Sequence, residues 1–399
     1  MEAEDKFRRW VKGVNEMMQI KVATPDVGQE EIDAVAEVLR SGNYVSGKRV
    51  KEFEEAFAEY VGTDFAIAVS SGTDALILAL FGAQVRPGKE VIVPPLTFFA
   101  TVAAPIHVGA RPVFADIDPE TYCLDPERVK EVLTERTAAI LPVHLYGNVA
   151  EMDELNEILY EEYDGKGTLR KRHKPYVIED ACQAHGAEYK GKKAGSLADA
   201  ACFSFYATKN MTTVEEGGMV TTNNPFLAKY VQILRNHGMV GRDDHIHVGA
   251  NNRLGEIGGA VGLIQLRKLD AMNAKRTFNS EYLNTELGKL GLSWMKLPTV
   301  KPYVKHAYFW FPVLIDEEQL GISIHELREF LGEAGIGTRY RYVEPLYKQP
   351  ALMNYGKHYA ELSLPNAEAI AGRMLGLPNH QKLATDELEY IIETFKDLG

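Results

Sequence analysis

The sequence predicts an α/β protein with a mostly parallel sheet and a smaller second domain, and two observations lead to this class. Seven short apolar runs alternate with helical patterns in the first part of the chain, as in βα units. Beyond Asn224 the pattern changes to longer helices, among them 257–282 with apolar residues at helical spacing. A chain of 399 residues also exceeds the size at which one core keeps growing. We therefore expect a large domain over 1–265, with a helical lead-in over 1–60, and a small α+β domain over 266–399.

The elements follow one another in a regular order. Two helical patterns within 28–60 flank a loop over 43–47, which either lines a site or only connects the helices. Charged and polar loops are expected over 164–174 and 245–253. Strands are expected at 65–69, 90–94, 112–116, 138–144, 176–179, 200–206, 219–222 and, in the second domain, 306–315. Helices are expected at 75–82, 152–160, 226–236, 257–282, 324–334 and 366–374.

Composition and charge narrow the class of partner. Hydrophobic residues make up 45% and charged residues 25% of the chain, which is ordinary for a globular protein. The net charge of −12 argues against a nucleic-acid or anionic-membrane partner, although helix N-termini and local cations can still hold a small anion. No run reaches the roughly 18 apolar residues of a membrane span. The three cysteines are odd in number and follow no metal-ligand spacing, so we expect no metal site and a reduced, cytoplasmic protein.

The N-terminal stretch 1–18 mixes both charges and lacks an apolar centre, so it does not resemble a signal peptide. It predicts a short amphipathic helix that carries its apolar residues on one side. These residues are Phe7, Trp10, Val11 and Val14.

A small-residue turn after the first strand predicts an anion site. The sequence Ser-Ser-Gly-Thr-Asp at 70–74 joins strand 65–69 to a helix, whose free N–H groups and dipole attract negative charge. The alternative is that Thr73 or Asp74 only caps this helix. Two aromatic residues after the next strand, Phe98 and Phe99, either belong to the core or stack on a flat ligand.

A carboxylate and a lysine follow two later strands. Asp180 directly follows the strand at 176–179, and Lys209 comes shortly after the strand at 200–206. Ligands of open α/β sheets bind outside the carboxyl ends of the strands, so these two groups are expected at the same ligand-binding edge of the sheet. Glu179 points to the opposite face because side chains alternate along a strand. The alternative is an ordinary surface pair of Asp180 and Lys209.

Pyridoxal 5'-phosphate needs this set of groups. Its aldehyde requires a lysine, its ring nitrogen an acid, its phosphate N–H donors at a helix start, and its ring an apolar or aromatic face. Burial would have to lower the pKa of Lys209 for the amine to react. No competing metal cluster or Ser-His-Asp set is evident, and no G-x-G-x-x-G opens a first βα turn. His144 and His185 are expected to be local hydrogen-bonding residues.

Seven motifs together resemble the DegT/DnrJ/EryC1/StrS family of pyridoxal-phosphate sugar aminotransferases, from about Thr24 to the C-terminus. The motifs are SSGTDAL (70–76), PPLTFFAT (94–101), PVHLYG (142–147), EDACQAHGA (179–187), AGSLADAACFSFYATKN (194–210), EEGGM (215–219) and GANNRLGEI (249–257). The resemblance implies the aspartate-aminotransferase-like fold (fold type I), with a seven-stranded, mostly parallel sheet and a smaller C-terminal domain. It also implies an obligate homodimer with active sites at the interface.

The resemblance carries roles to individual residues. Lys209 corresponds to the lysine that binds the cofactor and later moves the substrate proton. Asp180 corresponds to the partner of the ring nitrogen, Gln183 to a residue near the ring hydroxyl, and Phe98 to the ring-stacking position. Asn251 matches a phosphate contact contributed by the partner subunit, although Asn252 lies beside it. Further phosphate contacts are implied for Gly72, Thr73, Asp74 and Ser204.

The implied function is transfer of an amino group from an amino acid, expected to be L-glutamate, to a nucleotide-linked keto-sugar. Lys209 argues against a branch of the family that carries histidine there and dehydrates sugars. Where relatives more usually have a V-H-Y type segment, this chain has Arg339 and Arg341, which are candidates for binding a nucleotide diphosphate or the donor carboxylate. The alternatives are an aminotransferase for a non-nucleotide cyclic ketone, such as a keto-inositol, and a non-catalytic regulator. The sequence identifies neither the sugar nor the carbon that is aminated.

Overall fold

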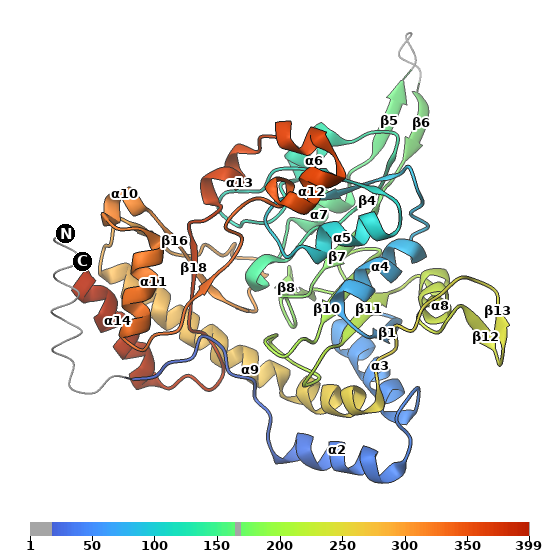
Figure 1. Cartoon of the computed structure of the whole chain (residues 1–399), viewed down its shortest axis with the longest axis horizontal. Coiled ribbons are helices and arrows are strands. Elements are labelled where there is room, and N and C mark those ends of the chain that lie inside the picture. Colours follow the sequence, from blue (N-terminus) through green and yellow to red (C-terminus); the bar gives the residue numbers. More distant parts are fainter. Residues whose placement is uncertain (1–17, 164–168, 399) are drawn as a thin grey trace.

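The computed structural model describes residues 18–163 and 169–398, and its largest unit is a seven-stranded sheet (Figure 1). The strand order is β1-β11-β10-β7-β4-β2-β3. Neighbouring strands are parallel except for β11, which runs antiparallel to both β1 and β10. All seven strands expected from the apolar runs of the large domain are present. They are β1 (Phe65–Val69), β2 (Glu90–Val93), β3 (Arg111–Phe114), β4 (Thr137–Ile140), β7 (Tyr176–Asp180), β10 (Ala200–Ser204) and β11 (Gly218–Thr222).

Helices cover both faces of this sheet. Along β1, Ile67 and Val69 belong to one buried cluster, whereas Ala66 and Ala68 belong to another, because successive side chains point to opposite faces. Helices α4, α5 and α8 supply the first cluster, and α3 and part of α9 supply the second. The helices of this unit are α2 (Gln29–Ser41), α3 (Lys48–Val61), α4 (Gly72–Gly82), α5 (Ala100–His107), α6 (Pro126–Val132), α7 (Met152–Asn156) and α8 (Pro225–Leu234), with the 3₁₀ turn η1 (Leu145–Gly147).

Helix α9 (Glu256–Lys289) spans 34 residues and extends past the expected range 257–282 at its C-terminal end. Its first half packs against α2 and α3, and its second half against α14 (Thr385–Leu398). Leu269 lies in the core beneath the seven-stranded sheet, whereas Leu283 lies in a separate core. One continuous helix therefore contributes to two hydrophobic cores.

The second core lies under an antiparallel sheet of order β14-β16-β18-β17. Ile20 joins this core and pairs with Ile336. The sheet and its helices are β14 (Met295–Lys296), β16 (Phe311–Ile315), β17 (Arg339–Tyr340), β18 (Met374–Leu377), α10 (Glu317–Leu320) and α11 (Ile324–Glu333). The helix expected over 366–374 is shorter than predicted: α13 (Pro365–Ile370) ends early, and Met374 begins β18.

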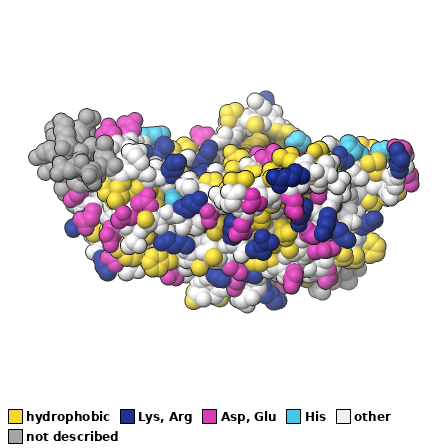
Figure 2. Space-filling model, turned by 90° about the horizontal axis from the view of Figure 1, so that it is seen from below, with side chains coloured by type: hydrophobic (Ala, Val, Ile, Leu, Met, Phe, Trp, Pro, Cys, Tyr) yellow, Lys and Arg dark blue, Asp and Glu magenta, His cyan; other side chains and the backbone are white. Residues whose placement is uncertain are grey.

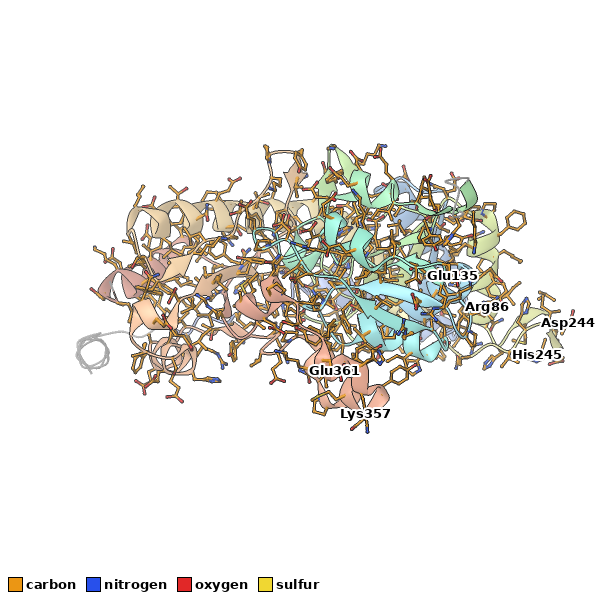
Figure 3. All side chains as sticks on the ribbon, turned by 90° about the horizontal axis from the view of Figure 1, so that it is seen from above. Arg86, Glu135, Asp244, His245, Lys357 and Glu361 are labelled. Atoms are coloured by element: carbon orange, nitrogen blue, oxygen red, sulfur yellow. The ribbon has the colours of Figure 1, made fainter. Side chains whose placement is uncertain are left out.

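The segment after β17 returns to the large sheet. The rings of Tyr347 and Tyr359 pack against Phe114 at 5.6 and 5.8 Å between centroids. This segment holds η2 (Leu346–Lys348), α12 (Pro350–Tyr355), η3 (Lys357–Glu361) and α13. Figure 3 shows Lys357 and Glu361 on a protrusion of the molecule. The predicted division at 265/266 remains a prediction.

Two hairpins project from the body. The loop expected over 164–174 is in part a hairpin of β5 (Tyr160–Tyr163) and β6 (Leu169–His173), in which Tyr160 pairs with His173. Residues 164–168 lie outside the described chain, as does most of the expected N-terminal helix with Phe7, Trp10, Val11 and Val14. The second hairpin, β12 (Met239–Gly241) and β13 (Asp244–His245), forms one extremity of the molecule (Figure 3). A small sheet of β15 (Val304–Lys305), β8 (Glu188–Tyr189) and β9 (Lys192–Lys193) completes the fold.

The surface is mixed in character. Figure 2, seen from the side on which α2 lies, shows hydrophobic side chains interspersed with both signs of charge. Ile32 and Leu39 of α2 are exposed there by more than half. Among the helices of the described chain, none is long and apolar enough to cross a membrane.

Candidate active site

A cavity of about 580 Å³ opens where β7, β10 and the first turn of α4 meet the segment 309–310 and strand β17. Nine residues predicted from the sequence line it, and they come from segments far apart in the chain. They are Gly72, Thr73, Phe98, Asp180, Gln183, Ser204, Lys209, Arg339 and Arg341. Sequence reasoning gave no role to several other lining residues, namely Thr101, Tyr206, Glu216, Phe309, Trp310 and Tyr342.

Asp180 is the last residue of β7 and is almost fully buried. Its backbone pairs with the extension of β4, since Asp180 N–H donates to the Pro142 carbonyl at 2.8 Å. Its carboxylate accepts a hydrogen bond from Thr101 Oγ1 at 2.7 Å and one from Cys182 N–H at 3.3 Å. The Thr101 hydroxyl also lies 3.2 Å from the Thr97 hydroxyl. Because the single proton of Thr101 is donated to Asp180, Thr97 is the donor to Thr101.

Lys209 lies in a turn after β10, where its N–H donates to the Tyr206 carbonyl at 2.8 Å. The next residue fixes this turn: Asn210 Nδ2 donates to Asn273 Oδ1 at 2.9 Å and to the Ala307 carbonyl at 2.8 Å. Burial lowers the pKa of Lys209, and Arg339 lowers it further, against the opposite effects of nearby acidic groups such as Asp180. A lysine with a lowered pKa carries more of the neutral amine that attacks a carbonyl.

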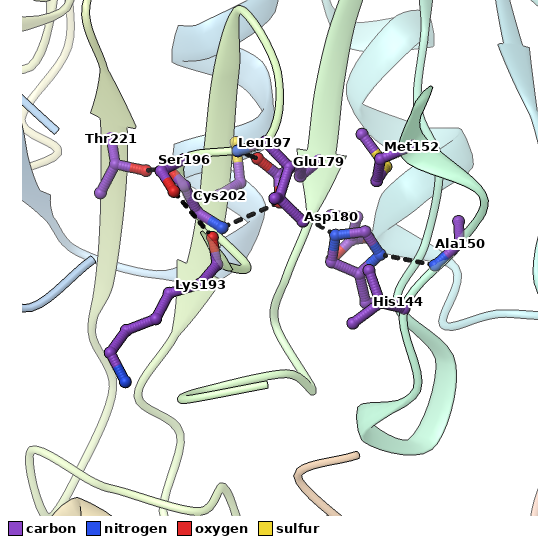
Figure 4. A network of polar contacts seen from close by, with 12 residues as sticks. His144, Ala150, Met152, Glu179, Asp180, Lys193, Ser196, Leu197, Cys202 and Thr221 are labelled. Carbon is purple, nitrogen blue, oxygen red and sulfur yellow. Dashed lines mark hydrogen bonds and ion pairs between the residues drawn. The ribbon is translucent and has the colours of Figure 1, made fainter. Parts of the chain in front are cut away.

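Glu179 does not line the cavity in the described chain, as strand alternation predicts, and Figure 4 shows it in a polar network with His144 and Leu197. Its carboxylate accepts from Gly195 N–H and Leu197 N–H, both at 2.8 Å, and lies 3.0 Å from His144 Nε2. Since Ala150 N–H donates to His144 Nδ1, a neutral imidazole carries its proton on Nε2 and donates it to Glu179. His144 is therefore a local hydrogen-bonding residue, as expected. His185 packs beside Phe203 and Phe205, and burial lowers its pKa to about 3.

The first turn of α4 has the backbone arrangement that the predicted anion site requires. Ser71 is the N-cap, so the N–H groups of Gly72 and Thr73 have no partner within the helix. A side chain at Gly72 would lie 2.6 Å from Ser204 Cβ, so only glycine lets this turn approach β10. The cap is Ser71 and not, as the alternative had it, Thr73 or Asp74. The Asp74 carboxylate instead accepts from the hydroxyls of Ser70 and Ser71 and from Asn252 Nδ2.

Two walls of the cavity are aromatic. Phe98 leaves 66% of its surface exposed, so its ring is accessible for stacking on a flat ligand. The other aromatic wall is a stack in which Trp310 lies 5.2 Å from Tyr146 and 6.4 Å from Tyr342 between ring centroids. Gln183 contacts two members of this stack: its side-chain oxygen accepts from Tyr146 N–H, and its amide donates to the Tyr342 hydroxyl at 3.2 Å.

Two predicted residues do not line this cavity in the described chain. Asp74 faces Ser70, Ser71 and Asn252, as stated above. Asn251 is exposed beside the β12–β13 hairpin and pairs with Asn236. The roles predicted for both residues remain predictions.

These groups fit pyridoxal 5'-phosphate. The unpartnered N–H groups at the start of α4 suit its phosphate, the exposed Phe98 ring suits its face, and the fixed carboxylate of Asp180 suits its ring nitrogen. Lys209 supplies the amine. The fold and this site together define a pyridoxal-phosphate-dependent enzyme of fold type I.

Comparisons with known proteins give the family. Residues 25–396 match the model of the DegT/DnrJ/EryC1/StrS aminotransferase family, and the chain belongs to this family of pyridoxal-phosphate-dependent sugar aminotransferases. It is 38% identical to a dTDP-3-amino-3,4,6-trideoxy-alpha-D-glucose transaminase of Streptomyces venezuelae, over 95% of either chain. It is 37% identical to a GDP-perosamine synthase of Caulobacter vibrioides, over 95% of this chain and 98% of that protein.

A solved structure agrees with this assignment. The sugar aminotransferase Spr1654 of Streptococcus pneumoniae, described as putative and solved in its pyridoxal-phosphate form, matches with a TM-score of 0.84 at 30% identity. The match covers 96% of this chain and 98% of that one. The predicted fold, enzyme class and cofactor are thereby confirmed.

Proposed function

We propose that this enzyme moves an amino group from L-glutamate to a nucleotide-linked keto-sugar. One observation carries the proposal: Lys209 and Asp180 lie in one cavity that also has two arginines, Arg339 and Arg341, on its wall. An enzyme that binds first the carboxylate of an amino acid and then the diphosphate of a nucleotide-linked sugar needs such cations. The two relatives named above carry dTDP-linked and GDP-linked sugars in their names, which supports a nucleotide-linked acceptor.

The residues have distinct tasks in this scheme. When bound, pyridoxal phosphate supplies an electron sink that stabilises negative charge on the substrate carbon. Asp180, held by Thr101, keeps a proton on the ring nitrogen. Lys209 accepts a proton from the substrate carbon in one half-reaction and returns one in the other. Its lowered pKa favours the neutral amine that can accept that proton.

The acceptor's charged end is assigned to the mouth of the cavity. Arg341 is exposed there, two residues beyond Arg339 in sequence. In a nucleotide-linked sugar the diphosphate is several bonds away from the ring carbon that reacts. An exposed cation such as Arg341 therefore suits the diphosphate.

A homodimer is the second part of this proposal. The β12–β13 hairpin and its surroundings expose large apolar side chains, with Val248 fully exposed and Phe226 exposed by 85%. Such surface is typical of an interface. Asn251, next to this hairpin, would then reach the cofactor phosphate of a second copy. Sedimentation should give a dimer, and Val248→Asp should shift the equilibrium towards the monomer; a monomeric parent protein would contradict the proposal.

An absorption spectrum tests the catalytic scheme. The purified protein supplied with pyridoxal phosphate should gain a visible band, and L-glutamate should convert it to the band of the amine form. Asp180→Asn should keep the fold, checked by circular dichroism, and lose most turnover; undiminished turnover would count against the assignment. A panel of nucleotide-linked and free cyclic keto compounds then identifies the acceptor. Amination of a keto-inositol alone would contradict the nucleotide-linked acceptor.

A further inference from the structure

We propose that Arg339 binds the α-carboxylate of the amino-acid donor, held in place on the indole of Trp310. This inference rests on the proposed function, since it names how the donor is recognised at the same site.

Arg339 and Lys209 lie over adjacent rings of one aromatic stack. The guanidinium carbon of Arg339 is 5.4 Å from the Trp310 ring centroid, and Lys209 Nζ is 4.7 Å from the Phe309 ring centroid. The two rings are themselves stacked, 5.5 Å apart with an interplanar angle of 24°. In an α-amino acid a single carbon separates the amine from the carboxylate. The residue that binds this carboxylate must therefore stand beside the lysine, as Arg339 does.

The partners of Arg339 leave room for an anion. Arg339 is about half buried, yet no carboxylate of residues 18–163 and 169–398 forms an ion pair with it. Its Nε has no hydrogen-bond partner in that part of the chain. Burial lowers the pKa of Arg339, and the nearby Arg341 lowers it further, so an anion here would relieve a charge that the protein leaves uncompensated. The planar guanidinium matches a carboxylate with two parallel N–H bonds.

The backbone is built to hold the Arg339–Trp310 pair. Arg339 on β17 pairs with Gly376 on β18. A side chain at Gly376 would lie 3.3 Å from Arg339 Cβ and 3.3 Å from a ring carbon of Trp310. Glycine at this position therefore lets the arginine and the indole meet across the strand.

Arg328 is a matched control. Its guanidinium lies 5.1 Å from the Tyr340 ring centroid, and its Nε is likewise buried without a partner among the described residues. Arg328 does not belong to the described lining of the cavity. Replacing it removes the same chemical group and a similar ring contact from the same domain, without touching the donor site.

The first experiment compares two amines on the cofactor-loaded enzyme. One is L-glutamate, and the other is 4-aminobutyrate, which is glutamate without its α-carboxylate. The second-order rate constant for loss of the visible band on mixing is measured for the parent enzyme, Arg339→Gln, Arg339→Lys and Arg328→Gln. We expect Arg339→Gln to lower the glutamate constant roughly 10- to 100-fold more than the 4-aminobutyrate constant, as for a lost charge-assisted hydrogen-bonded pair. Any effect through the pKa of Lys209 lowers both constants alike and cancels in their ratio. The glutamate rate constant of Arg339→Lys should lie between those of the parent enzyme and Arg339→Gln, because lysine keeps the positive charge but cannot form the two parallel N–H bonds of a guanidinium.

The control variants and the comparison of the two amines separate a loss of donor binding from a loss of folding. Arg328→Gln should change neither rate constant by more than about twofold. An equal loss with both amines in Arg339→Gln would show that the residue acts only through Lys209 or through folding, and would overturn the proposal. An unchanged glutamate constant would overturn it as well. Circular dichroism melts of each variant identify any loss that comes from unfolding.

The second experiment needs no turnover and no cofactor. Glutarate, a dicarboxylate without an amine, is titrated into the cofactor-free full chain while indole fluorescence is followed, because Trp310 lies under the proposed anion. A saturable change in the parent protein and in Arg328→Gln, lost in Arg339→Gln, supports the proposal. Absence of the change in the parent, or its persistence in Arg339→Gln, overturns it. If the chain never gains a visible band with pyridoxal phosphate, the proposed function fails, whereas this titration still reports on the anion site.

Discussion

Replacing Thr101 by valine should slow the enzyme without reshaping its site. Valine has nearly the same shape as threonine but lacks the hydroxyl that lies 2.7 Å from the Asp180 carboxylate. After the change, the described chain holds that carboxylate only through Cys182 N–H at 3.3 Å. A hydrogen bond to a charged group is worth roughly 1.5–3 kcal/mol. At about 1.4 kcal/mol per factor of ten, the full loss corresponds to a rate reduction of roughly 10- to 100-fold.

Thr97 allows the effect on activity to be separated from the effect on stability. Thr97 donates to Thr101 and does not contact Asp180 in the described chain, so Thr97→Val should change the rate by less than about threefold. Thr101→Val leaves the buried Thr97 hydroxyl without its acceptor, which should cost about 1 kcal/mol of folding stability or more. The double variant removes both hydroxyls, so it should regain stability but not rate.

The assay is the rate at which L-glutamate bleaches the visible band of the loaded enzyme, measured beside thermal melts of the same samples. A Thr101→Val enzyme with the parental rate would refute the view that this hydroxyl positions Asp180. A double variant that recovers both stability and rate would refute it too, because the loss in Thr101→Val would then have come from folding alone.

Two further predictions follow from burial and backbone geometry. Arg339 disfavours the protonated form of Lys209, so Arg339→Gln should raise the pKa of Lys209. The cofactor-free chain should then begin to bind pyridoxal phosphate covalently only at a higher pH. An onset at the same or a lower pH would contradict the predicted rise in the pKa of Lys209. Gly72→Ala places a methyl group 2.6 Å from Ser204 Cβ, so it should weaken cofactor retention in equilibrium dialysis and destabilise the fold by roughly 1–3 kcal/mol. The matched change Gly332→Ala, in α11 where the added carbon meets nothing within 4 Å, should leave retention unchanged, and equal losses in both variants would refute the steric argument.

The sheet and several residues that line the cavity could be predicted because their signals are local in sequence. Short apolar runs mark the seven strands, and the residues that follow them, such as Asp180 and Lys209, must then share one edge. The anion turn at Gly72 is likewise contained in a strand, a turn and a helix start.

The remaining features depend on contacts between distant segments. Trp310 and Tyr342 reach the cavity only because the second sheet packs beside the first, and no spacing in their own segments indicates this. Thr101 lies in the first turn of α5 and Thr97 in the bend before this helix, so no helical spacing indicates that their hydroxyls meet. Leu169–His173, within the charged stretch expected to be a loop, form a strand because cross-strand pairing overrides a composition that is typical of loops.

The continuity of α9 limits how the molecule can move. Its 34 residues correspond to roughly 50 Å of helix, and they are buried in both hydrophobic cores. The chain also crosses between the two cores at Ile20 and again after β17. A hinge requires a few residues that absorb large backbone rotations, and a packed helix offers none without breaking its hydrogen bonds. The two sheets should therefore behave as one rigid body through the catalytic cycle, and substrates should exchange through a mouth whose width stays constant.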